Sequence, residues 1–204
     1  MTNAPRVGVL ALQGDVAEHA RMLRTCDVEV QEVKTADQLA LVDALVIPGG
    51  ESTTIGMLAD REGLLKPLRE RIASGMPTLG TCAGLIFLAN ELIDARPDQV
   101  SIGALDATVR RNAFGRQVDS FEQDIKIQGL ATPFHAVFIR APLVEKVGQS
   151  VQVLATLASD KATLASDKIV MVRQANVLAT AFHPELTGDN RVHKMLCESI
   201  STEK

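Results

Sequence analysis

Short apolar runs alternate with segments of helical period over the first eighty residues. Four runs rich in Val, Ile and Leu predict buried strands at Val7–Leu12, Val28–Val33, Ala44–Ile47 and Pro77–Gly80. The segments between them predict helices near Val16–Arg24, Ala36–Leu41 and Leu64–Ser74. Because this alternation is typical of parallel strands joined by crossover helices, we expect a parallel sheet that is covered on both faces.

The second half of the chain is rich in strand-like segments joined by short links. They occur at Val109–Arg111, Asp124–Ile127, Ala136–Arg140, Val151–Leu157, Ile169–Arg173 and Val177–Phe182, before a last helix near Arg191–Ile200. Short links favour antiparallel additions to the sheet. No Pro-, Gly- or Ser-rich linker separates the halves, so we expect one domain over residues 1–204. The predicted fold is α/β, flavodoxin-like and three-layered, with a mixed, mainly parallel central sheet.

The composition is typical of a globular domain. The 204 residues are 46% hydrophobic, and the net charge of −4 comes without a basic cluster. We therefore expect neither nucleic acid nor membrane as a partner, and a small neutral or zwitterionic ligand fits better. The sequence contains no signal peptide and no apolar run of membrane-spanning length, so we expect a cytoplasmic protein. Its cysteines, Cys26, Cys82 and Cys197, match neither a disulfide framework nor a zinc site, and we expect no metal or other cofactor.

A seven-residue segment is present in two adjacent copies, Ala155–Lys161 and Ala162–Lys168. Repeat architectures need longer units and at least three copies. We therefore interpret the second copy as a lengthened hairpin between two strands and expect no function from it.

Cys82 lies where a predicted strand is followed directly by a predicted helix. In an open parallel sheet, ligands bind at the loops beyond the carboxyl ends of the strands. A helix N-terminus favours a thiolate and offers unpaired N–H groups. Gly80, Ala83 and Gly84 leave room for a tight turn, like the nucleophile elbow of serine hydrolases. A buried inert cysteine is the alternative, which a base elsewhere in the chain would exclude. We expect Cys26 and Cys197 to be packing residues.

A candidate base occurs near the end of the chain, where a strand is followed by His183, Pro184 and Glu185. Proline fixes the turn, and the spacing of two residues lets the carboxylate reach back to the imidazole and set its tautomer. With Cys82, these residues form a complete nucleophilic set.

The other histidines give weaker signals. His19 lies in the first predicted helix, His135 precedes a strand and His193 lies in the last helix. We expect surface or capping roles for His135 and His193.

A third stretch, PGGESTT, begins at Pro48 and follows the third predicted strand. Its two glycines let the backbone approach a ligand, and Glu51 and Ser52 lead into a helix that begins near Thr53. Alone, this stretch is as consistent with a purely structural turn and N-cap as with a ligand-binding loop. A second loop at the same sheet edge as Cys82 favours function, because an oxyanion hole takes one N–H from the nucleophile's turn and one from another loop.

Together these stretches resemble the class I, triad-type glutamine amidotransferases. Over almost the whole chain, segments resemble the glutaminase subunits of pyridoxal 5'-phosphate synthases: Leu10–Asp15 with Glu18 and His19, Pro48–Thr54, Gly80–Gly84, Arg111–Glu122, Val137–Pro142 and Phe182–Thr187. The GTCAG and HPE motifs alone indicate only the superfamily, whereas PGGEST and FGRQVDSFE make the resemblance specific. The duplicated ATLASDK is the one departure, and it affects only the local hairpin.

The resemblance implies a mechanism and a set of site residues. Cys82 would attack the side-chain amide of L-glutamine, giving a γ-glutamyl thioester and ammonia, and water would then release glutamate. His183 would move the protons and Glu185 would orient it. The implied oxyanion donors are the backbone N–H groups of Gly50 and Ala83. The implied substrate-binding residues are Gly50, Glu51, Ser52, Arg111, Ile139 and Arg140. The implied partner-facing residues are Gln13, Asp15 and His19.

An arginine suits the α-carboxylate of an amino acid because its planar fork binds carboxylate with two hydrogen bonds. The resemblance assigns this role to Arg111. Its neighbour Arg110 is then a surface charge.

The resemblance also implies a partner. The sequence contains no Schiff-base lysine motif and no recognised phosphate-binding loop, so the chemistry that uses the ammonia must lie elsewhere. The implied partner is a synthase subunit that builds pyridoxal 5'-phosphate from ribose 5-phosphate and glyceraldehyde 3-phosphate in a hetero-oligomer. The alternatives are a glutaminase for another synthase, a stand-alone flavodoxin-like cysteine hydrolase or chaperone, and a non-catalytic binding module.

Overall fold

The computed structural model describes residues 4–111, 120–158 and 167–200. Its strands are β1 (Arg6–Leu10), β2 (Glu29–Val33), β3 (Ala44–Ile47), β4 (Thr78–Thr81), β5 (Ala89–Ile93), β6 (Leu105–Arg110), β7 (Ser120–Ile125), β8 (Phe134–Ile139), β9 (Leu143–Val147), β10 (Gln152–Leu157), β11 (Lys168–Gln174) and β12 (Val177–Thr180). Its helices are α1 (Val16–Leu23), α2 (Ala36–Ala40), α3 (Ser52–Arg61), α4 (Leu65–Ala73), α5 (Ala83–Leu88), the 3-10 helix η1 (Pro184–Leu186) and α6 (Arg191–Cys197).

One mixed sheet of ten strands contains strands from both halves of the chain. Its order is β2-β1-β3-β4-β12-β11-β9-β6-β5, and β10 pairs with β11 beside this path. The first five strands in this order are mutually parallel, and β5 is parallel to β6. The other pairs, around β11 and β9, are antiparallel. The predicted α/β fold with a mixed, mainly parallel sheet is confirmed.

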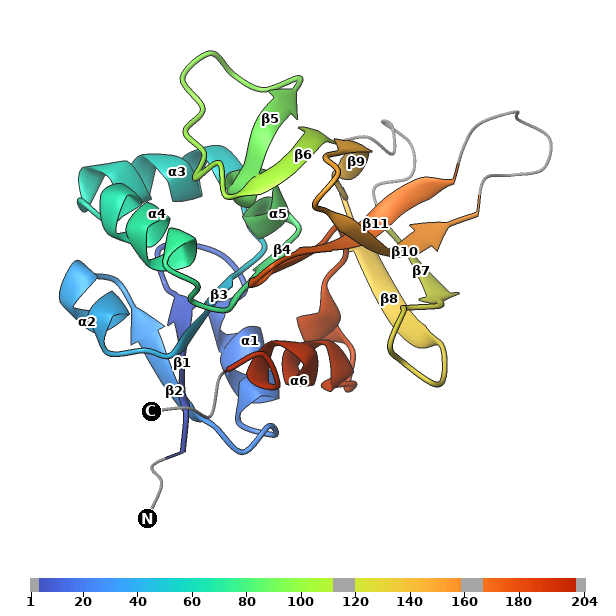
Figure 1. The fold of residues 1–204 in the computed structure, drawn as a ribbon, viewed down its shortest axis with the longest axis horizontal. Coiled ribbons are helices and arrows are strands. Elements are labelled where there is room, and N and C mark those ends of the chain that lie inside the picture. Colours follow the sequence, from blue (N-terminus) through green and yellow to red (C-terminus); the bar gives the residue numbers. More distant parts are fainter. Residues whose placement is uncertain (1–3, 112–119, 159–166, 201–204) are drawn as a thin grey trace.

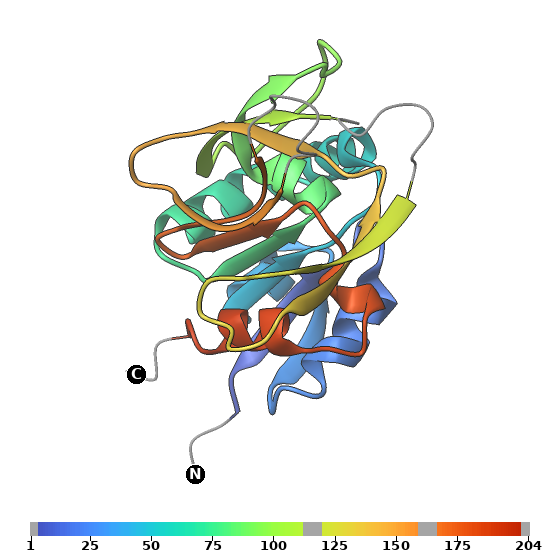
Figure 2. The same ribbon diagram turned by 90° about the vertical axis from the view of Figure 1, so that its right-hand side faces the viewer.

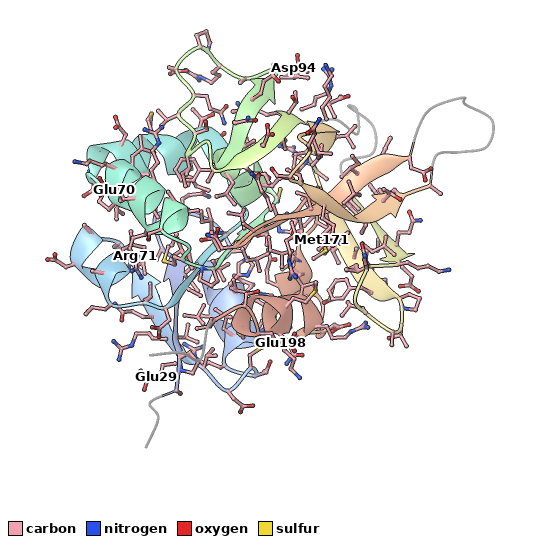
Figure 3. All side chains as sticks on the ribbon, viewed as in Figure 1. Glu29, Glu70, Arg71, Asp94, Met171 and Glu198 are labelled. Carbon is pink, nitrogen blue, oxygen red and sulfur yellow. The ribbon has the colours of Figure 1, made fainter. Side chains whose placement is uncertain are left out.

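Helices cover both faces of the parallel part of this sheet, as Figure 1 shows. Helices α2, α3, α4 and α5 lie on one face, and α1 and α6 lie together on the other. Between them, the apolar run of β3 is fully buried, from Ala44 to Ile47. In Figure 3, Met171 of β11 lies at the middle of the molecule, where it is fully buried, while Glu70 and Asp94 lie at its periphery. None of the helices described is both long and apolar enough to cross a membrane.

The second half departs from the prediction in its strand directions. Strand β12, expected as an antiparallel addition, is parallel to β4, with Val177 opposite Thr78. The reason is its hairpin with β11, which reverses the chain so that β12 runs in the direction of β4. Strands β7 and β8 do not join the main sheet but form their own antiparallel pair, which stands in front of it in Figure 2.

Two strands, β5 and β9, were not expected from the sequence. Strand β5 contains the exposed polar pair Asn90 and Glu91, and β9 contains Glu145 and Lys146. Such short, partly charged segments lack a continuous apolar run, and only pairing with β6 reveals them.

The duplicated segment lies at the hairpin of β10 and β11. The two strands are antiparallel and pair Leu157 with Lys168, so the predicted hairpin is confirmed at its base. Residues 159–166, which hold most of the duplication, lie outside the described residues.

Candidate active site

Cys82 connects β4 to α5 in a backbone conformation that L-residues rarely adopt, with φ 48° and ψ −100°. The glycines of the motif explain how the turn is accommodated. A Cβ on Gly84 would overlap the carbonyl oxygen of Ile47, and one on Gly80 would lie 2.8 Å from the Gly84 backbone. The elbow therefore packs directly against β3, and only glycine fits at these two positions. The Cys82 Sγ lies 3.9 Å from the carbonyl oxygen of Ile139.

His183 and Glu185 lie beside this elbow, where the chain leaves β12 and enters η1. The His183 N–H donates to the Val137 carbonyl of β8 at 2.8 Å, which fixes the backbone of the histidine. Its Nδ1 lies 2.7 Å from Oε1 of the fully buried Glu185. It also lies 3.4 Å from Oδ2 of Asp15, at the start of α1. With Nδ1 engaged, Nε2 is the ring nitrogen left for proton exchange with Cys82.

The titrating groups around His183 are strongly coupled. Burial tends to lower the pKa of His183, but hydrogen bonding with Asp15, Cys82 and Glu185 outweighs it and raises this pKa to about 12. Burial raises the pKa of Glu185, against the opposing hydrogen bond from His183. The hydrogen bond with His183 lowers the pKa of Asp15. The site therefore holds a proton on the imidazole, next to the sulfur of Cys82.

The turn Gly49-Gly50 lies against the ring of His183. A Cβ on Gly49 would come within 2.5 Å of the His183 Cε1, and Gly50 has a φ of +144°. The Glu51 N–H donates to Oε1 of Gln13 at 2.7 Å, so a side chain from the β1–α1 loop holds this turn. Gln13, predicted to face a partner, thus contacts the predicted oxyanion turn directly.

The predicted oxyanion donors follow two neighbouring strands. Strands β3 and β4 are adjacent and parallel, so the turns after them open at the same edge of the sheet. Ala83 is the first residue of α5, and its N–H has no acceptor within the helix. Gly50 follows β3 by three residues. This geometry is suited to an oxyanion that meets one N–H from each turn.

Glu51 combines helix capping with an ion pair. Its carboxylate accepts from the N–H groups of Thr53 at 3.0 Å and Thr54 at 2.7 Å, as the N-cap of α3. Burial acts to raise the pKa of Glu51, but these hydrogen bonds outweigh it and lower the pKa to about 2. Arg111 Nη2 lies 3.0 Å from Glu51 Oε1. Glu51 is therefore an anion already paired with the arginine expected to bind substrate.

Gln99 connects two of the predicted substrate-binding residues, Arg111 and Ser52, and its role was not predicted from the sequence. It accepts from Arg111 Nη1 and donates from Nε2 to the buried Ser52 Oγ at 3.0 Å. No motif marks Gln99, because its role comes only from the fold. Arg110 instead pairs with two surface carboxylates, as expected for a surface charge.

Strand β8 ends at Ile139, close to Cys82, and Arg140 follows it. The Ile139 carbonyl faces Cys82, as given above, and the residue is 37% exposed. Arg140 is exposed, with a φ of 44°, and its contact with substrate stays a prediction.

Two of the histidine predictions are wrong. His19, expected to face a partner, and His193, expected at the surface or as a helix cap, are both fully buried. The reason is that α1 and α6 pack together on one face of the sheet and direct these side chains inward. His135 is exposed as expected and lies between Glu122 and Asp124.

Asp15, His183 and Glu185 place metal-ligand atoms within 4.8 Å of one another. The His183 Nδ1 that a metal would need is already hydrogen-bonded to Glu185, and Glu185 has no exposed surface. We therefore interpret this cluster as part of a proton-transfer site. A nucleophile on an elbow beside a base, with a third group that orients the base, is typical of acyl transfer.

Comparison with known proteins agrees with this interpretation. The model of the SNO glutamine amidotransferase family matches residues 9–202. The chain is 55% identical over 199 residues to "Pyridoxal 5'-phosphate synthase subunit PdxT" of Frankia alni, covering 97% of this chain and 96% of that protein. It is 56% identical over 203 residues to the protein of the same name from Acidothermus cellulolyticus, covering 99% and 97%. A solved structure described as "Crystal structure of glutamine amidotransferase" superposes with a TM-score of 0.87 at 48% identity, covering 95% of this chain and 98% of that one.

Proposed function

The chain belongs to the SNO glutamine amidotransferase family, and we propose that it hydrolyses L-glutamine with Cys82 as nucleophile, His183 as proton carrier and Glu185 as the carboxylate that orients it. It is the glutaminase component of a pyridoxal 5'-phosphate synthase. The observation that carries the residue assignment is the 2.7 Å bond from His183 Nδ1 to Glu185 Oε1, beside a cysteine at positive φ.

In the first half of the reaction, the Cys82 sulfur, which has passed its proton to His183, attacks the amide carbon of glutamine. The resulting oxyanion meets the N–H groups of Gly50 and Ala83, and collapse breaks the C–N bond as His183 donates a proton to the leaving nitrogen. The products are a γ-glutamyl thioester and ammonia. The proton held on His183 is thus in place for the leaving group.

In the second half, water attacks the thioester carbon while His183 accepts its proton. The C–S bond then breaks, glutamate leaves and the Cys82 sulfur is restored. Glu185 stabilises the imidazolium in both halves through its bond to Nδ1.

Arg111 and Glu51 suit the zwitterionic end of glutamine, because the pair offers a cation and an anion side by side. Gln99 accepts from Arg111 and donates to Ser52, and in this way it holds the arginine of the pair. Ile139 and Arg140 complete the substrate-binding residues that we propose.

A synthase subunit is the proposed partner, in a hetero-oligomer that passes ammonia on directly. We propose that docking at the β1–α1 loop, around Gln13 and Asp15, orders the Gly49-Gly50 turn and directs the Gly50 N–H into the oxyanion hole. The contact from Glu51 N–H to Gln13 supports this route. One oxyanion donor is typically worth about 10² to 10³ in rate. We also propose a reducing, cytoplasmic location, because the nucleophile is a free cysteine. The proposal places the whole activity in a single domain over residues 1–204.

The experiment is a glutaminase assay with and without the synthase subunit. Cys82→Ala should lose at least about 10⁴-fold in turnover, because the attacking atom is gone. Cys26→Ala, which removes another buried thiol, is the matched control and should stay near wild type. A glutamine-analogue electrophile should label Cys82 alone. Substantial turnover by Cys82→Ala would refute the mechanism, whereas equal rates with and without a bound synthase would refute only the gating by docking.

A further inference from the structure

Two fully buried histidines lie directly behind the proposed triad, and no step of the mechanism above uses them. His19 Nδ1 of α1 lies 2.9 Å from His193 Nε2 of α6. His19 Nε2 lies 3.1 Å from the Thr81 hydroxyl, one residue before Cys82. The same nitrogen is 3.3 Å from Oε2 of Glu185. Through these contacts, His19 and His193 link α1 and α6 to Glu185, the carboxylate that orients the base.

The contacts determine where the protons lie on the two rings. Each neutral imidazole carries one N–H, so one ring must donate in the 2.9 Å bond and the other accept. If His19 donated, the N–H of His193 would be on Nδ1, which is buried without a hydrogen-bond partner, and a bare lone pair of His19 would face the Glu185 oxygen. If His193 donates, its unpartnered Nδ1 is only an acceptor, and His19 carries its proton on Nε2. The second arrangement leaves no buried N–H unpaired.

Glu185 needs this proton. Its Oε1 accepts from His183, but its Oε2 is buried, and no described group donates to it with good hydrogen-bond angles. The nearby His19 Nε2–H points mainly to Thr81 and lies 3.3 Å from Oε2, so a small rotation of the ring directs it to either oxygen. A neutral N–H donor stabilises the Glu185 carboxylate without placing a second positive charge beside the imidazolium of His183.

We propose that His19 is a positioning residue that donates its Nε2 proton to the orienting carboxylate Glu185, and that His193 fixes His19 in the tautomer that can do so. This inference rests on the triad assigned under the proposed function. It assigns to the α1–α6 packing a role in catalysis, because the two helices hold the donor in place.

The surroundings keep both rings uncharged. The groups that face His19 are Thr81 from β4, His193 from α6, and His183 and Glu185 around η1. Burial, together with the two neighbouring histidines, lowers the pKa of His19 well below its usual value. Burial lowers the pKa of His193 to about 4. Both rings are therefore neutral donors and acceptors throughout the physiological range.

The first test compares His19→Leu with His19→Gln in the complex with the synthase. Leucine fills space without a donor, whereas the Gln amide places an N–H near the position of Nε2. His19→Leu should lower kcat about tenfold with KM little changed, as expected for one lost bond to a charged group. It should also move the acid limb of the pH–rate profile up by about one unit, since a carboxylate that loses a donor has a higher pKa. His19→Gln should recover both values to within about threefold, and His135→Leu, at an exposed histidine, should change neither.

The thermal unfolding of each variant separates this role from a structural one. If kcat follows the melting temperature and His19→Gln gives no rescue or no return of the pH limb, the positioning role is wrong. His193→Phe keeps a ring at that position but removes the donor to His19, and it should give a smaller loss of kcat in the same direction.

The second test does not depend on activity. The ¹⁵N NMR signals of the histidine rings, assigned with His19→Leu and His193→Phe, should show both residues neutral and protonated on Nε2 from pH 6 to 8. Protonation of His19 on Nδ1, or titration of either ring in this range, would overturn the proposal even if Cys82→Ala behaves as expected. Conversely, an active Cys82→Ala variant would refute the triad itself while these NMR signals stay as described.

Discussion

The two turns that are proposed to bind the oxyanion are built in opposite ways. The elbow from Gly80 to Gly84 is buried along its whole length, and β3, β12 and α5 pack against it. The Gly49-Gly50 turn is half exposed, and a side-chain hydrogen bond from Gln13 holds the residue after it. The nucleophile is thus fixed when the chain folds, whereas the second oxyanion donor depends on a contact that a neighbouring molecule can change.

This difference indicates where control of the reaction is possible. A partner cannot move the elbow without disrupting packing on both faces of the sheet, which costs stability. It can move the Gly49-Gly50 turn at little cost, because glycine at positive φ changes conformation easily and the turn reaches the surface. Variants in the two turns should therefore differ in whether they lose folding stability together with turnover.

Gly84→Ala should have the largest effect, because it disrupts both properties of the elbow. The new methyl group would overlap the Ile47 carbonyl, which is backbone and cannot move aside cheaply. We expect a loss of about 1 to 3 kcal/mol in unfolding free energy. A displacement of Cys82 by an ångström would also lower turnover by about 10². Denaturant unfolding and the glutaminase assay measure the two losses.

Gly188→Ala is the matched control for this variant. Gly188 has no positive φ, and a Cβ added there would meet no atom within 4 Å, so the substitution should leave stability and turnover unchanged. A stable, active Gly84→Ala variant would show that the elbow adapts as readily as the other turn.

Gly50→Ala should instead lower turnover while leaving stability nearly intact. The φ of +144° is unfavourable for alanine, and the added Cβ would meet the end of the flexible Gln13 side chain. The turn can rearrange at the surface, but the Gly50 N–H then leaves the oxyanion hole. We expect about 10² to 10³ in lost kcat at a melting temperature close to that of the wild type. A loss of stability as large as that of Gly84→Ala would contradict the distinction between the two turns.

Gln13→Ala should have a smaller effect on the same turn. It removes the acceptor for the Glu51 N–H at 2.7 Å, and one neutral hydrogen bond contributes about 0.5 to 1.5 kcal/mol. Turnover should therefore fall by about 2- to 10-fold, and more of it should be recovered when the synthase is bound. Gln13→Glu keeps an oxygen acceptor at the same place and should retain most of the activity. If both variants behave alike, the hydrogen bond does not hold the turn.

Part of this comparison could be predicted from the sequence. The apolar runs of β1 to β4, the glycines around Cys82 and the two-residue spacing of His183 and Glu185 carry their structural meaning locally. That is why the strands, the elbow and the close contact of base and carboxylate were expected and are found.

The remainder depends on contacts between distant segments, which no local pattern encodes. The direction of β12 follows from its pairing with β4, which lies far earlier in the chain. The burial of His193 follows from the contact of α6 with α1, because a seven-residue helix with a charged neighbour on each turn does not show which face is covered. Gln99 acquires its role only when Arg111 and Ser52 meet around it.

The smallest expected effect concerns the duplicated segment between β10 and β11. Deleting Ala162–Lys168 leaves one copy of the heptapeptide, so Lys161 takes the place of Lys168 opposite Leu157. Since the closure cost of a loop grows only slowly with its length, unfolding free energy should change by about 1 kcal/mol or less. Turnover should stay within about twofold, because β12 lies between β11 and β4, the strand that leads to Cys82. Denaturant unfolding and the glutaminase assay test both expectations. A deletion that unfolds the chain would show that the second copy packs as part of the sheet, and the hairpin would then have to be grouped with the rigid elbow.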